Sequence, residues 1–310
     1  MNTQSNAIPD SPVEARVSAP AMIPESRLLY WSVQRELWES RSIYIAPLGA
    51  AGLILCGFLL SMFRLPSQMR AALALDPMQQ HELLSKPYNF ASLLIMGTTF
   101  IVAVFYCLDA LHGERRDRSI LFWKSLPVSD LTTVLSKASI PIVVIPLLTF
   151  AITVITQWTM VLMSSVALLG SGLSLTTLWN ELSLSQMWMN LLYHLVTIHA
   201  LWYAPIFCWL LLVSAWARRA PILWATLPLL AIALVERIAF NTMHFAAMLG
   251  NRMGGGAEAI TMQGSAPMDP MMTHLTPAHF VSSAGLWIGL TIAAAFLAGA
   301  VRLRRDQGPV

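Results

Sequence analysis

The chain has 310 residues, of which 56% are hydrophobic and only 11% are charged, and its formal net charge is +3. Because a soluble domain usually carries about 25% charged residues, this composition excludes an ordinary water-soluble domain and indicates that lipid surrounds most of the chain. A nucleic-acid partner is not expected either, since the sequence has no tract of lysine and arginine interleaved with aromatic residues.

The N-terminal segments precede the first long apolar stretch. Residues 1–25 are rich in proline and small polar residues, and we expect them to form a disordered cytosolic tail. Residues 26–42, "SRLLYWSVQRELWESRS", place apolar side chains on one helical face and Arg35, Glu36 and Glu39 on the other. This pattern predicts an amphipathic helix lying in the membrane interface, with tryptophans at headgroup level. The alternative is that the segment only extends the first membrane span.

Six later stretches are long and apolar enough to cross a bilayer as helices. The sequence therefore predicts an all-α integral membrane protein, with a transmembrane domain over residues 26–310. Its six transmembrane helices are expected at about residues 43–63, 89–111, 139–168, 190–214, 222–240 and 283–302.

The distribution of lysine and arginine predicts the orientation, because cytosolic segments carry an excess of these residues. With a cytosolic N-terminus, the outside loops hold only Arg64, Arg70, Lys86 and Arg252, and Arg237 lies within the fifth span. Both termini are then inside, together with the remaining basic residues: Arg16, Arg27, Arg35, Arg41, Arg115, Arg116, Arg118, Lys124, Lys137, Arg218, Arg219, Arg302, Arg304 and Arg305.

The first large cytosolic loop, residues 112–138, contains an unusual apolar segment. A charged run, "ERRDR", is followed by four adjacent large apolar residues, "ILFW", and then by Lys124 and a helix-ending Pro127. Ser129 is placed to cap the helix that leads into the third span. Contiguous exposed apolar side chains with a basic rim are typical of a protein-binding surface. The alternative is that this segment dips back into the membrane interface, where tryptophan is common.

The order of these features resembles the ABC-2 type permease family, the membrane subunits of one class of ABC exporter. The similar features are the helix with "RELWESRS" before the first span, the six spans, and the first cytosolic loop with "SILFWKSLPVSDL" followed by Lys137. In that family the corresponding loop carries a coupling helix that docks into a groove on a separate ATP-binding subunit. The resemblance implies that the same contact is made here by Glu114, Arg115, Arg118, Ile120, Leu121, Phe122, Trp123, Lys124 and Pro127.

The resemblance also implies partners and a location. Two cytosolic ABC ATPase subunits would bind ATP and magnesium, and a second copy of the chain or a sister permease would complete the pore. The protein would be a multi-pass protein of the bacterial inner or cell membrane. The chain has no G-x-x-x-x-G-K-[ST] motif, so we expect no cofactor bound by this chain and no enzyme activity of its own.

Other features leave alternatives open. A membrane-anchored sensor or assembly factor could use the same apolar segment to hold a cytosolic partner without transport. Thr149, Thr153 and Gln157 form a polar stripe on the third span, which indicates either a pathway or dimer seam or hydrogen bonds between helices. A methionine- and histidine-rich loop over residues 243–279 contains ligands that suit Cu(I), although its irregular spacing favours flexible apolar cover and we expect no metal site.

Overall fold

The computed structural model describes residues 25–72, 75–124, 128–169, 182–254 and 277–306. Predictions for the N-terminal tail, for Pro127 and for residues 255–276 of the methionine-rich loop lie outside these ranges. The described residues form helices and contain no strand, in agreement with the predicted all-α fold.

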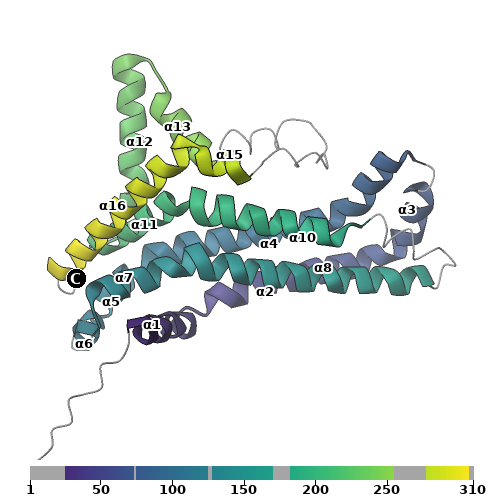
Figure 1. Cartoon of the computed structure of the whole chain (residues 1–310), viewed down its shortest axis with the longest axis horizontal. Coiled ribbons are helices and arrows are strands. Elements are labelled where there is room, and N and C mark those ends of the chain that lie inside the picture. The colour runs from purple at the N-terminus through teal and green to yellow at the C-terminus, as the bar shows by residue number, and fades with distance from the viewer. Residues whose placement is uncertain (1–24, 73–74, 125–127, 170–181, 255–276, 307–310) are drawn as a thin grey trace, which may run out of the picture.

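The first half of the chain begins with a helix that is separate from the first span. α1 ends at Glu39, and a break at Ser40 and Arg41 precedes α2. α1 packs against α7 at one end of the bundle, and α3 lies at the opposite end (Figure 1). The helices of this half are α1 (Glu25–Glu39), α2 (Ser42–Ser61), η1 (Met62–Arg64), α3 (Leu65–Ala72), α4 (Pro77–Asp109), α5 (His112–Arg116) and α6 (Ile120–Lys124).

The second half begins at a capped helix. Ser129 Oγ accepts a hydrogen bond from the backbone N–H of Thr132 at 3.0 Å, which confirms the predicted cap. Its helices are α7 (Asp130–Ser139), η2 (Ile140–Val144), α8 (Ile145–Leu169), α10 (Leu184–His194), η3 (Leu195–Trp202), α11 (Ala204–Trp216), α12 (Pro221–Phe240), α13 (His244–Met253), α15 (Pro277–Ser282) and α16 (Ala284–Asp306).

Five segments of the described structure are long and apolar enough to span a membrane, and a bent pair raises the number to six. The bent pair joins Leu184–Trp202 to Ala204–Trp216 at 45°. The fourth predicted span is therefore not one straight helix. Pro205, next to the bend, explains this because proline lacks the N–H that would continue the helical hydrogen bonds.

The bundle has two main layers of core packing. Near the end that carries α1, Ile43, Cys107, Ile140, Phe207 and Leu211 are buried together from α2, α4, η2 and α11. Towards the other end, α2, α4 and α8 pack through a second cluster that contains Phe58, Tyr88, Met160 and Leu168.

α12 stands apart from this bundle (Figure 1). Among its described residues Ala225 alone is buried, and large apolar side chains such as Leu230 and Ile238 are exposed around the helix. A helix that is apolar on all faces is stable when lipid or another transmembrane helix covers it.

Candidate functional site

A buried cluster of charged side chains lies where α1, α5, α7 and α16 meet, at one end of the bundle. Lys137 Nζ of α7 lies 2.9 and 3.0 Å from the two carboxylate oxygens of Glu36 and 3.1 Å from Glu114 Oε1. The side chains of Glu36, Glu114 and Lys137 are each less than 5% exposed. This one ammonium group therefore joins α1 to α5 through α7.

Glu36 has two further partners besides Lys137. Tyr106 Oη of α4 donates a hydrogen bond to Glu36 Oε2 at 2.9 Å, and Arg35 Nη2 lies 2.6 Å from Oε1. Burial by itself raises the pKa of Glu36, but the positive charges of Lys137 and Arg35 outweigh it, and the net effect is a lowered pKa. Glu36 is thus held as a carboxylate in the interior.

Glu114 connects the cluster to the last helix of the chain. Its second carboxylate oxygen pairs with Arg304 Nη1 of α16, and Arg304 Nε lies 3.0 Å from Asp130 Oδ1 at the start of α7. With Arg35, Lys137 and Arg304 against Glu36, Glu114 and Asp130, the formal charges cancel. Such balance is needed because an unpaired buried charge is costly.

The same short helix α5 is fixed to the end of α11. The backbone N–H groups of Leu111 and His112 donate to Ser214 Oγ at 3.0 and 2.9 Å. Arg115 Nη1 donates to the carbonyl oxygens of Ala215 and Ala217, two of the acceptors that a helix end leaves unpaired. Within α5, Glu114 therefore contacts the buried charges, and His112 and Arg115 contact the end of α11.

α6 follows α5 after a tight turn at Arg118, whose φ of 59° is in the left-handed region. Ile120 is buried, whereas Leu121 and Phe122 are 59% and 60% exposed. Trp123 is half-buried, and the guanidinium of Arg35 lies 3.8 Å from the centre of its ring. This cation–π contact ties α6 to α1.

These positions correct several expectations for the docking segment. Glu114 and Arg115 are buried and contact other parts of the same chain, so they do not face a partner protein. Ile120 is also buried, and Trp123 is covered on one face by Arg35. The predicted contact residues that stay exposed are Arg118, Leu121, Phe122 and Lys124, and we call the surface formed by these four side chains the α6 face.

The helical-wheel expectation for Glu36 is wrong. The periodicity of residues 26–42 places it on a polar face, yet its side chain is 3% exposed. The wheel describes α1 alone, whereas the partners of Glu36 come from α4 and α7. The available signal was the position of Lys137 and Arg304 beside membrane spans in a charge-poor chain, where ionisable residues usually have a specific partner.

The polar stripe of the third span lies between helices of this chain. Gln157 Nε2 donates to the Tyr88 carbonyl at 3.1 Å and to Ser92 Oγ at 2.8 Å, and Trp188 Nε1 donates to Gln157 Oε1 at 2.8 Å. Gln157 thereby links α8 to α4 and α10. Thr149 donates to the Ile145 carbonyl within its own helix, and Thr153 is buried. A role for these residues along a pathway or seam stays a prediction.

No group of three or more histidine, cysteine or carboxylate side chains suited to a metal ion is found in the described ranges. The cluster itself offers no open position for a ligand, since its carboxylates are occupied by Lys137, Arg35 and Arg304. The cluster therefore has a structural role: it holds the ends of α1, α5, α7 and α16 together, and α6 is attached to α1 through Arg35 and Trp123.

The chain was compared with protein families, curated proteins and solved structures, and no family model, curated protein or solved structure matches it. The functional argument therefore depends on the geometry of the site.

Proposed function

We propose that this chain is the permease subunit of an ABC exporter, and that the α6 face is the contact for a separate ATP-hydrolysing subunit. The observation that carries the proposal is the pairing of an exposed apolar surface with a rigid base. Leu121 and Phe122 are exposed on α6, while the adjacent Trp123 and α5 are fixed to α1, α7 and α16.

This arrangement supports force transmission. A motor protein that binds a flexible loop moves the loop alone, whereas one that binds a clamped helix moves what the helix is attached to. α5 is attached to α7, which continues through η2 into α8, and to α11 and α16. Movement of α6 would therefore shift several spans together, which is a known route to switching between two states.

The partners follow from the same proposal. ATP and magnesium would bind to two cytosolic ATPase subunits, because this chain carries no phosphate-binding loop motif. A second permease copy or a sister permease would complete the pore, and the exposed apolar side chains of α12 offer it a surface to cover. The complex would lie in a bacterial inner or cell membrane with the α6 face in the cytosol.

A co-purification experiment tests the proposal. The tagged full chain is expressed in its native host, solubilised and captured, and ATP hydrolysis by the captured material is measured. We expect an ATP-hydrolysing chain to co-purify with the wild type, and the double substitution Leu121→Ser with Phe122→Ser to reduce its recovery at least about tenfold, because the central apolar residues of an interface carry most of its affinity.

The matched control is Phe63→Ser, which removes an 89% exposed phenylalanine at the opposite end of α2. It should retain the partner. Recovery of a cytosolic chain that does not hydrolyse ATP would favour the sensor or assembly factor instead. Equal recovery of the ATPase by the wild type and the α6 variant would show that α6 is not the contact.

A further inference from the structure

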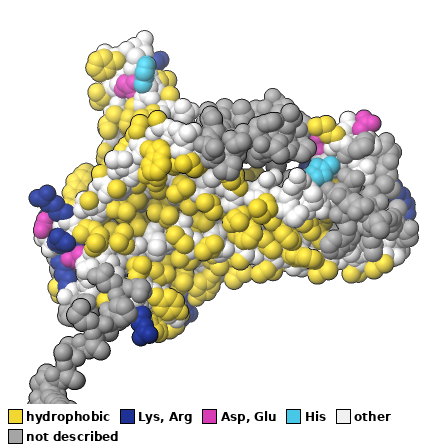
Figure 2. Space-filling model, in the orientation of Figure 1, with side chains coloured by type: hydrophobic (Ala, Val, Ile, Leu, Met, Phe, Trp, Pro, Cys, Tyr) yellow, Lys and Arg dark blue, Asp and Glu magenta, His cyan; other side chains and the backbone are white. Residues whose placement is uncertain are grey.

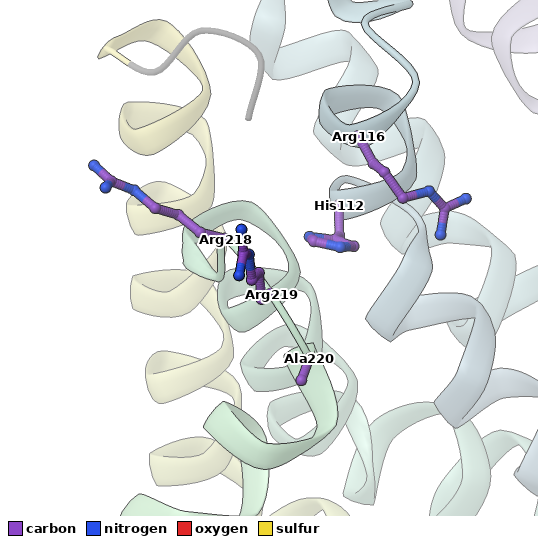
Figure 3. Close-up of a pocket in the computed structure, with 5 residues that line it drawn as sticks. All are labelled: His112, Arg116, Arg218, Arg219 and Ala220. Carbon is purple, nitrogen blue, oxygen red and sulfur yellow. The ribbon is translucent and has the colours of Figure 1, made fainter.

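A basic cavity lies beside the buried charge cluster, at the link between α11 and α12. Its volume is about 420 Å³, and it is lined by His112, Arg116, Arg218, Arg219 and Ala220. The His112 ring extends towards the link that carries Arg219, and Arg218 and Arg116 extend to opposite sides (Figure 3). The proposed docking of an ATPase on α6 uses none of these residues.

Positive charge is in excess around this cavity. Arg218 and Arg219 are exposed, and neither forms an ion pair with any side chain in the described ranges. Arg116 pairs with Asp109 at 3.8 Å and Asp117 at 3.0 Å, and both pairs are exposed to solvent. Buried Arg115 adds a further positive charge next to Arg218. The cavity is therefore lined by three arginines, and the two carboxylates beside it pair with Arg116.

The backbone of the link adds to the positive electrostatic potential at the cavity. Ala220 has a φ of 46° and precedes the 20-residue helix α12, whose N-terminus has no side-chain cap. Pro221 has no N–H and the N–H of Leu223 donates to the Ala220 carbonyl at 3.0 Å, so the contribution of this end is the dipole of a long helix, which favours an anion. On the other side, the Nδ1–H of buried His112 donates to the Ala217 carbonyl at 3.1 Å, which fixes the imidazole in the cavity wall.

The surroundings indicate a ligand that carries acyl chains. α12 leaves the bundle from this cavity, and its exposed side chains Ile222, Leu223 and Leu227 require an apolar environment. Trp216 and Trp224 pack edge to face at 4.8 Å beside the link and are both partly exposed. Tryptophan concentrates at the level of lipid headgroups, so this pair indicates that the link and its arginines belong at that level.

Figure 2 shows the charged residues gathered at the ends of the molecule, with apolar surface between them. The cavity is lined from α5 and from the link between α11 and α12, and α5 lies at the same end of the molecule as the last turns of α16 (Figure 1). A phosphate held here would sit between one bundle helix and the exposed helix α12, and its acyl chains would fill the space along α12.

We propose that this cavity binds the phosphate headgroup of an anionic phospholipid and that the lipid holds α12 against the bundle. Guanidinium groups bind phosphate through paired N–H donors, and basic pockets between membrane helices are suited to anionic headgroups. A zwitterionic headgroup carries its own positive charge and is disfavoured by the unpaired arginines.

Native mass spectrometry of the detergent-purified full chain tests this. Phosphatidylglycerol and phosphatidylcholine with the same acyl chains are titrated separately. We expect one phosphatidylglycerol to bind at least about tenfold more tightly than phosphatidylcholine, and the difference to disappear in the variant with Arg218→Gln and Arg219→Gln, because two charges at a headgroup site account for about that factor. The variant with lysine at both positions should keep most of the preference.

The matched control replaces Arg302 and Arg305, two exposed arginines of α16 at the same end of the molecule, with glutamine. It makes the same change in net charge and should leave the phosphatidylglycerol affinity within about twofold. Equal loss in both double variants would show general charge attraction and overturn the site. Glycerol 3-phosphate is titrated in parallel, and if it binds as tightly as the lipid, the ligand is a free phosphate and the lipid proposal is wrong.

Discussion

Glu114 and Arg304 are separated by 190 positions in the sequence, yet their side chains form an ion pair in which each is only 4% exposed. The pair joins the short helix after the second span to the last turn of the last span. Because the same carboxylate also contacts Lys137, this contact fixes three helix ends relative to one another, and it is the most direct link between α16 and the base of the α6 face.

Replacing Glu114 with glutamine should strongly destabilise the protein. The substitution keeps the shape of the side chain but leaves Arg304 and Lys137 with one fewer carboxylate, in a place that water does not reach. Breaking a buried charge pair by removing one partner costs about 3–5 kcal/mol. Thermal unfolding of the purified chain in detergent, followed by loss of the monodisperse peak, measures the effect.

Two further variants serve as controls for Glu114. Glu39→Gln removes an exposed carboxylate that lies 3.7 Å from Arg35, and it should cost less than about 1 kcal/mol. Exchanging the charges, with Glu114→Arg and Arg304→Glu together, should recover part of the stability lost by Glu114→Arg alone. A Glu114→Gln variant as stable as Glu39→Gln would contradict the importance of the cluster.

The spans, the separate N-terminal helix and the cap at Ser129 were predictable because each depends on neighbouring residues. Hydropathy over some twenty residues is sufficient to find a span. The bend before Ala204 also had a local signal in Pro205. The burial of Glu36 had no signal among its own neighbours, because it depends on Lys137 and Tyr106, which distant helices bring to it. The indication in the sequence was the position of Lys137 and Arg304 beside membrane spans. The exposure of the apolar segment was likewise overestimated from the sequence, since Ile120 is buried by other elements.

Glu36 should give the cluster a characteristic dependence on pH. Its pKa is lowered in the folded protein from a model-compound value of 4.5, so the folded state favours the ionised form. Its contribution to stability is complete above that ordinary value and is lost as the pH falls through the lower, folded-state pKa. The stability difference between wild type and Glu36→Gln should therefore be constant at neutral pH and shrink in acid.

Thermal unfolding midpoints of both proteins, measured from neutral pH to about pH 3, provide the comparison. Other carboxylates titrate in both proteins, and their effects cancel in the difference. A difference that stays constant down to the lowest pH would show that the carboxylate of Glu36 does not titrate in this range.

Trp123 should matter through its ring rather than its exposed edge. Trp123→Leu removes the surface on which Arg35 stacks at 3.8 Å, and we expect a loss of about 1–2 kcal/mol. Trp123→Phe keeps an aromatic face and should lose less. In a background with Arg35→Gln, the two substitutions should become more alike, because the cation is gone. If the stabilities of Trp123→Leu and Trp123→Phe still differ by the same amount in that background, packing alone holds Trp123.

The orientation predicts which positions are open to an impermeant thiol reagent. In a chain whose native cysteines are replaced by alanine, single cysteines at Lys124, Arg302 and Arg70 report on both ends of the bundle. Because basic residues concentrate in cytosolic segments, we expect position 70 to react in intact cells and positions 124 and 302 only after permeabilisation. Reaction at position 124 in intact cells would place the α6 face outside and contradict the docking proposal.

The polar stripe of α8 offers a contrast between two buried side chains. Gln157 bonds to groups on α4 and α10, so Gln157→Met, which keeps its length but not its hydrogen bonds, leaves Trp188 Nε1 without this acceptor. We expect a loss of about 1 kcal/mol, the usual size for such contacts in membranes. Thr153 Oγ1 is buried without a hydrogen-bond partner in the described ranges, so Thr153→Val should be neutral or slightly stabilising because it removes an unsatisfied hydroxyl. Thermal unfolding of the two variants measures their effects on helix packing. A Thr153→Val variant with normal stability but reduced export would show that the polar stripe lines a transport pathway.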